Sequence, residues 1–279
     1  VKVMARDIEL AVGAAKAAVE NAGILTKGII AEGSSDAPTY APNRVGCHIG
    51  AGLIAAETDE LTGALATARQ DGGSFDLRAW GESGMNNLQP LWLLKYLPNM
   101  LSCHVTIIHD AQGPSNTITC AEASGGLSIG ESMRVIERGD ADLCFSGGAE
   151  SKINLMGLLR MSLAGRLAET GDEADGGKVV RPYDRAAPGG VLGEAGAILM
   201  LEAADTASKR GAKAYAELVG FGAGHSPWSD DAAERAEGLI AAIENALEDA
   251  ELSAAEIDAI VPHGSGIRDV DAEEAVALL

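Results

Sequence analysis

Short apolar runs typical of buried strands alternate with amphipathic helical patterns along nearly the whole chain. Several of these runs are apolar at successive positions, so helices are expected to cover both faces of the sheet that they form. The alternation favours an α/β architecture with parallel-rich sheets. The strands and helices fall into two series, which predicts one half at residues 1–211 and a second half at residues 212–279.

The pattern also places the individual elements. Strands are expected at residues 43–52, 116–119, 141–150, 196–202, 214–224 and 257–266. Helices are expected at residues 4–24, 53–70, 124–140, 203–212, 230–252 and from 271 onward, with one or two helical turns between residues 91 and 115. Residues 71–90 are expected to be a loop, and residues 152–180 a Gly/Asp-rich loop region around a short helix.

Charge limits the partners that such a chain can have. The 21 basic and 41 acidic residues give a net charge of −20, which disfavours nucleic acids and anionic membranes as partners. An acidic partner protein would need a local basic patch. Cys47, Cys103 and Cys144 lie in apolar runs without metal-ligand spacing, so we interpret them as small buried side chains in a reducing compartment. We expect a soluble cytoplasmic protein, because neither a signal peptide nor a membrane span is apparent. We also expect no metal and no cofactor.

The corner between the strand at residues 116–119 and the following helix is the first candidate site. A turn of small residues into a helix leaves backbone N–H groups free and places the positive end of the helix dipole there. These groups lower the pKa of a thiol and hold an oxyanion. Two candidate nucleophiles lie in this corner, Cys120 and Glu122. A purely structural role for the glycines of the corner is the alternative.

The sequence HGSG, which begins at His263, is the second candidate site. A histidine at the carboxyl end of a parallel strand lies where open α/β sheets bind ligands. A capping or core histidine is the structural alternative. We favour a structural role for the other four histidines, which are His48, His104, His109 and His225.

Five segments together identify a family resemblance. GPSNTITCAEASGGLSIG, GDADLCFSGGAE, RPYDRAAPGGVLGEAGAILMLE, KRGAKAYAELVGFG and VPHGSG with the acidic residues that follow it resemble the β-ketoacyl-ACP synthases of fatty-acid and polyketide synthesis. The resemblance covers nearly the whole chain. It implies the thiolase-like fold, in which two βαβ-rich halves form five layers in the order αβαβα. It also implies acyl carrier protein as partner and a homodimer joined at the SNTIT strands.

The resemblance implies a decarboxylative Claisen condensation. In the family a cysteine accepts an acyl group, and two histidines assist decarboxylation of malonyl-ACP. Counting from Gly113 and from Gly125 places Glu122, not Cys120, at the nucleophile position. His263 matches the first catalytic histidine. Supporting residues matched by the motifs are Asp271, Glu274 and the family's buried glutamate, here Glu194.

The chain departs from the family in several places. A carboxylate is a poor acceptor of an acyl thioester, because the product would be a reactive anhydride. Ile267 stands where the family has Thr, and Gly189-Gly190 where it has Gly-Phe. The family's catalytic Lys, second His and first strand are absent from these residues, which we interpret as an incomplete sequence.

These departures leave four interpretations open. The first is a catalytically atypical synthase-family protein of fatty-acid or polyketide synthesis. The second is a non-catalytic partner of a Cys-bearing synthase, similar to a chain-length factor, in a heterodimer. The third is a malonyl-ACP decarboxylase that uses His263. The fourth is an active synthase that uses Cys120.

Overall fold

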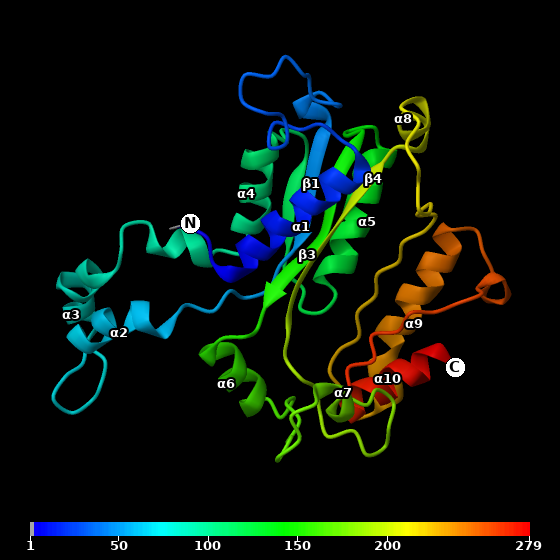
Figure 1. The fold of residues 1–279 in the computed structure, drawn as a ribbon. Helices are drawn as coiled ribbons and strands as arrows, with labels where there is room; N and C mark the ends of the chain where they lie inside the picture. The colour runs from blue at the N-terminus through cyan, green and yellow to red at the C-terminus, as the bar shows by residue number, and fades with distance from the viewer. Residues whose placement is uncertain (1–2) are drawn as a thin grey trace. The chain divides into compact units, whose positions relative to one another are not determined.

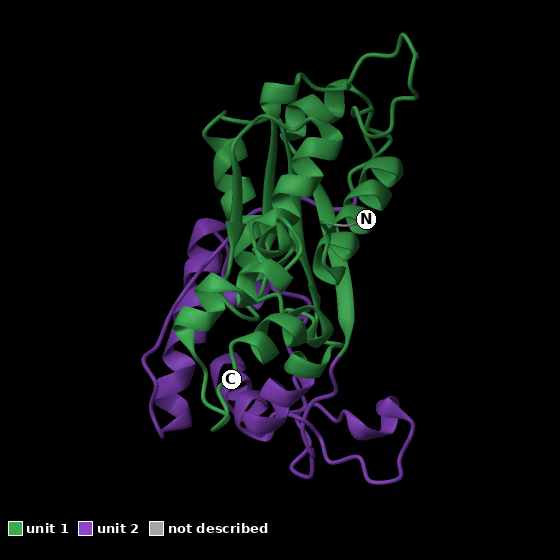
Figure 2. Cartoon of the chain, turned by 90° about the vertical axis from the view of Figure 1, so that its left-hand side faces the viewer, with its two compact units in different colours: residues 1–157, 193–214 green, residues 158–192, 215–279 purple. Residues whose placement is uncertain are grey.

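The computed structural model describes residues 3–279, which form two compact units (Figure 2). Unit 1 contains residues 1–157 and 193–214, and unit 2 contains residues 158–192 and 215–279. Each unit is therefore built from two separate stretches of chain. The predicted halves, residues 1–211 and 212–279, refer to two series of strands and helices and not to these compact units, so this division stays a prediction.

Unit 1 contains the sheet and most of the helices (Figure 1). Its strands are β1 (Val45–Gly50), β2 (Ser115–Ile118), β3 (Leu143–Ser151) and β4 (Glu194–Glu202). Its α-helices are α1 (Arg6–Ala22), α2 (Thr58–Thr67), α3 (Leu77–Glu82), α4 (Met100–His109), α5 (Ser124–Glu137) and α8 (Ala204–Lys209). Short 3-10 helices are η1 (Pro42–Arg44), η2 (Gly84–Asn87) and η3 (Trp92–Tyr96).

The four strands form one mixed sheet in the order β2-β1-β3-β4. β1 is parallel to both β2 and β3, with Cys47 opposite Ser115 on one side and opposite Phe145 on the other. β3 and β4 are antiparallel, with Phe145 opposite Met200. The sheet with its flanking helices confirms the predicted α/β class.

Helices cover both faces of this sheet. α1 packs against β3 and β4, and α4 packs against β1 and β2. α5 packs against β1 and β3. Gly196 of β4 lies against the Leu10 carbonyl of α1, whereas Gly148 of β3 lies against Gly125 of α5. Gly148 is opposite Ala197, the neighbour of Gly196, and side chains alternate along a strand, so these two contacts lie on opposite faces of the sheet. The core lies in this unit, with Ile8, Ile49, Leu101 and Phe145 fully buried.

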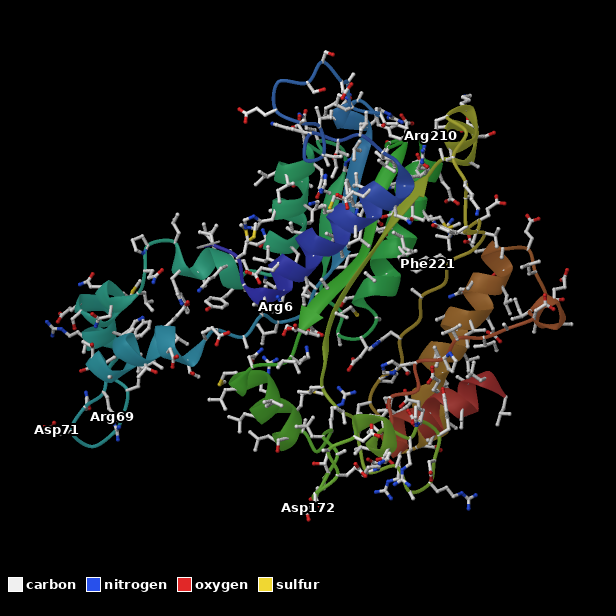
Figure 3. The ribbon with its side chains drawn as sticks, viewed as in Figure 1. Arg6, Arg69, Asp71, Asp172, Arg210 and Phe221 are labelled. Carbon is white, nitrogen blue, oxygen red and sulfur yellow. The ribbon has the colours of Figure 1, made fainter. Side chains whose placement is uncertain are left out.

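Unit 2 contains helices and extended chain. Its helices are α7 (Gly176–Val179), η4 (Ala254–Glu256), α9 (Ala232–Asp249) and α10 (Arg268–Leu278), and α6 (Leu155–Leu163) crosses the boundary between the units in sequence. The predicted strands at residues 214–224 and 257–266 are wrong, because neither stretch pairs with another strand within residues 3–279. The first stretch, which contains Phe221 (Figure 3), lies against α9 through closely approaching glycines instead.

The loop predicted at residues 71–90 is wrong in part. α3 and η2 lie within it. The side chain of Asp76 accepts hydrogen bonds from the backbone N–H groups of Arg78 and Ala79, and so begins α3. Among residues 3–279, no helix combines the length and the apolar character needed to cross a bilayer.

Candidate active site

The backbone turns sharply between β2 and α5, where the family resemblance predicts the nucleophile position. Ala121 has a φ of 45°, the left-handed region that non-glycine residues rarely adopt. The neighbouring residues Cys120 and Glu122 are exposed. Strained backbone of this kind persists where the surrounding structure over-determines it, as functional sites often do.

Ser124 fixes this corner. Its buried hydroxyl accepts a hydrogen bond from the Cys120 N–H at 2.7 Å and donates to the Ala121 carbonyl at 2.7 Å. One side chain therefore satisfies two backbone groups on either side of the strained peptide. Ser124 was not among the site residues predicted from the sequence. A hydroxyl at the first position of a helix was the available signal that it could bind the preceding turn.

The start of α5 lies directly against the ends of two parallel strands. A side chain at Gly50, the last residue of β1, would collide with the backbone of Ser124 and Gly125. Ser128 ties the same helix to the sheet, since its hydroxyl lies 2.6 Å from the Gly147 carbonyl of β3. The corner therefore lies at the carboxyl edge of the parallel strands, where α/β sheets bind ligands.

The chemistry available at this corner differs between the two candidates. The start of the fourteen-residue helix α5 favours negative charge. A thiolate there is a strong nucleophile, and the same N–H groups stabilise the oxyanion that follows its attack. Glu122 offers a carboxylate in the same turn, which is a weak acceptor of acyl groups. Cys120 lies two residues after the end of β2, before the strained peptide.

Glu194 was expected to be buried, and this is wrong. It lies exposed at the start of β4. The guanidinium of Arg6 (Figure 3) pairs with its carboxylate at 2.5 Å, and the Ser151 hydroxyl donates to it at 2.9 Å. The hydrogen bond from Arg6, followed by that from Ser151, lowers the pKa of Glu194. Arg6 comes from α1, so the motif around Glu194 could not reveal this partner.

In unit 2, Glu274 holds the beginning of the HGSG turn. One carboxylate oxygen accepts the His263 N–H at 2.6 Å, and the other accepts the Gly264 N–H at 2.9 Å. The phenol of Tyr183 donates to that second oxygen at 2.5 Å. Burial opposes the charged form of Glu274, but these donors outweigh it and lower the pKa of the carboxyl group.

Asp271 holds the rest of the turn. Its carboxylate accepts the Ser265 N–H and the Ser265 hydroxyl, each at 2.7 Å, and the Gly266 N–H at 3.0 Å. The backbone N–H of Tyr183 donates to it at 2.9 Å. Asp271 is only 2% exposed. Burial opposes its charge, yet the four donors lower its pKa below the ordinary value.

Four successive backbone N–H groups are therefore held by two carboxylates. Asp271 and Glu274 were predicted from the motif, and the structure brings both to the turn that carries His263. Tyr183 was not predicted from the sequence; its N–H contacts Asp271 and its hydroxyl contacts Glu274. The predicted site residues Glu122, Cys120 and Glu194 belong to unit 1, whereas His263, Asp271 and Glu274 belong to unit 2.

Two of the remaining histidines and two of the cysteines are buried, whereas Cys103, which was predicted to be buried, is only half-buried. His48 is buried in β1, and burial lowers the pKa of its imidazole. His109 is buried with its Nδ1 2.7 Å from the Thr26 hydroxyl. Cys47 and Cys144 are buried, and burial raises the pKa of Cys144 to about 12. Among the described residues no three His, Cys, Asp or Glu side chains cluster as metal ligands would.

Comparisons with known proteins identify both parts of the chain. Residues 1–207 match the model of the beta-ketoacyl synthase N-terminal domain, and residues 215–279 match that of the C-terminal domain. A mitochondrial 3-oxoacyl-[acyl-carrier-protein] synthase of Arabidopsis thaliana is 34% identical over 71% of this chain and 43% of its own length. 3-oxoacyl-[acyl-carrier-protein] synthase 2 of Staphylococcus aureus is 30% identical over 99% of this chain and 62% of its own length.

Solved structures agree with these matches. A beta-ketoacyl synthase from Burkholderia phymatum superposes with a TM-score of 0.78 at 26% identity, covering 99% of this chain and 61% of that one. The ishigamide ketosynthase/chain length factor gives a TM-score of 0.76 at 26% identity, covering 99% and 60%. The thiolase-like α/β fold is thereby confirmed. The chain spans less than two thirds of the length of these relatives, and it belongs to the beta-ketoacyl synthase family.

Proposed function

We propose that this chain is a catalytically atypical 3-oxoacyl-ACP synthase of fatty-acid or polyketide synthesis, which does not form the usual acyl-cysteine. The observation that carries the proposal is Glu122 at the nucleophile position of an otherwise well-formed corner. Ser124 holds the backbone of that corner, and α5 begins where an acyl-enzyme oxyanion would need N–H donors. The scaffold for acyl transfer is present, but the thiol is replaced by a carboxylate.

His263 supports a chemistry that does not need this thiol. An imidazole beside a malonyl thioester can stabilise the enolate oxygen that develops as the carboxylate leaves as CO2. The two carboxylates that hold its turn keep the histidine backbone in one conformation. Decarboxylation of a malonyl thioester is therefore the part of the family reaction that these residues favour.

A partner role is the second candidate. The similarity to the ishigamide ketosynthase/chain length factor favours a subunit that pairs with a Cys-bearing synthase. β2 lies at the edge of the sheet in unit 1, so its outer edge is available for pairing with another copy or with such a synthase. The names of the relatives make acyl carrier protein the expected second partner.

Covalent labelling tests the proposal. The full-length protein is incubated with acyl-ACP, and the intact mass is measured for the wild type, Glu122→Cys, Glu122→Gln and Cys120→Ala. We expect an acyl adduct only in Glu122→Cys, whose thiolate attacks the thioester carbonyl and releases the carrier thiol. Glu122→Gln is the matched control, because it removes the charge without adding a thiol.

Other outcomes select the alternatives. A wild-type adduct that Cys120→Ala abolishes would establish an active synthase using Cys120. Release of CO2 from malonyl-ACP by the wild type supports the decarboxylase chemistry of His263, and its loss in His263→Ala assigns the residue. Co-purification with a Cys-bearing synthase, without CO2 release, supports the partner role.

A further inference from the structure

Tyr183, which lies outside α10 and the HGSG turn, contacts both carboxylates of the turn by hydrogen bonds. Its N–H lies 2.9 Å from Asp271 Oδ2, and its hydroxyl lies 2.5 Å from Glu274 Oε2. The two bonds use different parts of the residue. The backbone serves one carboxylate and the side chain serves the other.

The backbone of Tyr183 is strained. Its φ of 61° lies in the left-handed region, which is costly for a residue with a large side chain. Such a conformation persists only where surrounding contacts over-determine it. Here it lets one residue direct its N–H toward Asp271 and its phenol toward Glu274.

The segment before Tyr183 also supports the turn sterically. Gly264 has a φ of 55°, and a Cβ at this position would come within 3.2 Å of Pro182 Cβ and 3.6 Å of Tyr183 Cε2. The ring of Tyr183 therefore lies beside the peptide that Glu274 holds. Burial and then the bond to Glu274 raise the pKa of the phenol to about 12, so it remains a proton donor at neutral pH.

We infer that Tyr183 is a positioning residue, which fixes the backbone of His263 and Gly264 through the hydrogen bond from its phenol to Glu274. The phenol supplies a donor to the same oxygen that accepts the Gly264 N–H, so it restricts the carboxylate to one orientation. Asp271 is reached by the backbone alone and does not depend on the side chain. The value of this positioning for catalysis rests on the proposed role of His263.

Tyr183→Phe tests the inference, because it removes the hydroxyl and keeps both the ring and the backbone N–H. Amide hydrogen exchange is measured by NMR on the full-length protein. We expect His263 and Gly264 to exchange about fivefold faster, the effect of losing one hydrogen bond of ordinary strength. Ser265 and Gly266, which Asp271 holds, should keep their wild-type rates.

Tyr40→Phe is the matched control. The Tyr40 hydroxyl also donates to a glutamate, Glu202, at 2.5 Å, but both residues belong to unit 1. This variant loses the same kind of bond and should leave exchange at His263 and Gly264 unchanged. Equal acceleration of all four amides of the turn in Tyr183→Phe, or no acceleration at all, would overturn the inference.

Activity gives a separate readout. The second measurement is the release of CO2 from malonyl-ACP, the reaction proposed for His263. Tyr183→Phe should lower kcat of this reaction about fivefold and leave KM unchanged, because the hydrogen bond from the Tyr183 phenol to Glu274 orients the histidine and does not bind substrate. An unchanged kcat beside accelerated exchange contradicts the proposed role of His263, while the positioning of its backbone stands. The failure of one proposal is thus distinguishable from the failure of the other.

Discussion

The corner before α5 and the HGSG turn are both tight backbone structures, but they are held by different chemistry. In the corner a single neutral hydroxyl, that of Ser124, bonds two backbone groups around a strained alanine. In the turn two carboxylates accept four successive N–H groups, and Tyr183 binds both of them. The corner therefore depends on one neutral side chain, and the turn depends on ionised ones.

This difference determines which side chains can be replaced without changing the backbone of each region. The two hydrogen bonds of the Ser124 hydroxyl join Cys120 and Ala121 and do not use the side chain at position 122. Replacement of the nucleophile is therefore compatible with an intact corner. The turn has no such separation, since the residues that shape it also set the electrostatic surroundings of His263.

The largest predicted effect comes from removing the buried carboxylate of the turn. Asp271→Ala leaves the N–H groups of Tyr183, Ser265 and Gly266 without their acceptor in a buried site. We expect the free energy of unfolding to fall by about 3 kcal/mol, measured by urea denaturation. Asp269→Ala, on the same helix but exposed, is the control and should change it by less than about 0.5 kcal/mol.

Equal effects of these two substitutions would show that the turn does not depend on its carboxylate. In that case the four hydrogen bonds to Asp271 would contribute little more than hydrogen bonds to water do.

The sequence predicted the sheet of unit 1 well, because β1, β3 and β4 contain apolar runs and each strand has a neighbouring strand to pair with. β1, β2, β3 and β4 all lie within predicted strands or overlap them. The stretches 214–224 and 257–266 have the same local pattern but no pairing strand among the described residues. Local pattern encodes the tendency to extend, whereas a ladder requires a partner.

The candidate site shows the same limit. Motif counting could select Glu122, His263, Asp271 and Glu274 as candidates because their spacing within each motif is local. The contribution of Tyr183 could not be predicted in this way, because 91 residues separate it from Glu274. Its left-handed backbone is equally invisible in the sequence, since Tyr has no preference for that region.

The stability contributed by two carboxylates, one in each unit, depends on pH in opposite senses. The folded pKa of Asp271 is lowered, so its ionised form contributes stability above its ordinary pKa, and this contribution is lost as pH falls through the folded value. Asp7, in unit 1, behaves in the opposite sense. Burial raises its pKa despite the N–H of Ser151 at 3.0 Å, so it favours folding more as pH falls.

Two variants separate these contributions. Between about pH 5 and about pH 2, we expect Asp271→Asn to lose less stability than the wild type, by about 1 kcal/mol in urea denaturation. Between pH 7 and pH 4, we expect Asp7→Asn to lose more than the wild type, also by about 1 kcal/mol. Parallel pH profiles for the wild type and Asp271→Asn would contradict the dependence of the turn on an ionised carboxylate.

The smallest predicted effect tests whether the corner stores strain. Ala121→Gly relieves a left-handed alanine and should stabilise the protein by about 0.5 kcal/mol, since the relief exceeds the added entropy of the unfolded chain. Ala17→Gly is the control, because Ala17 is exposed in the interior of α1, where the same exchange should destabilise by about 0.5–1 kcal/mol. Opposite signs in urea denaturation would show that the strain belongs to the peptide before Glu122; equal signs would mean that the corner is held without it.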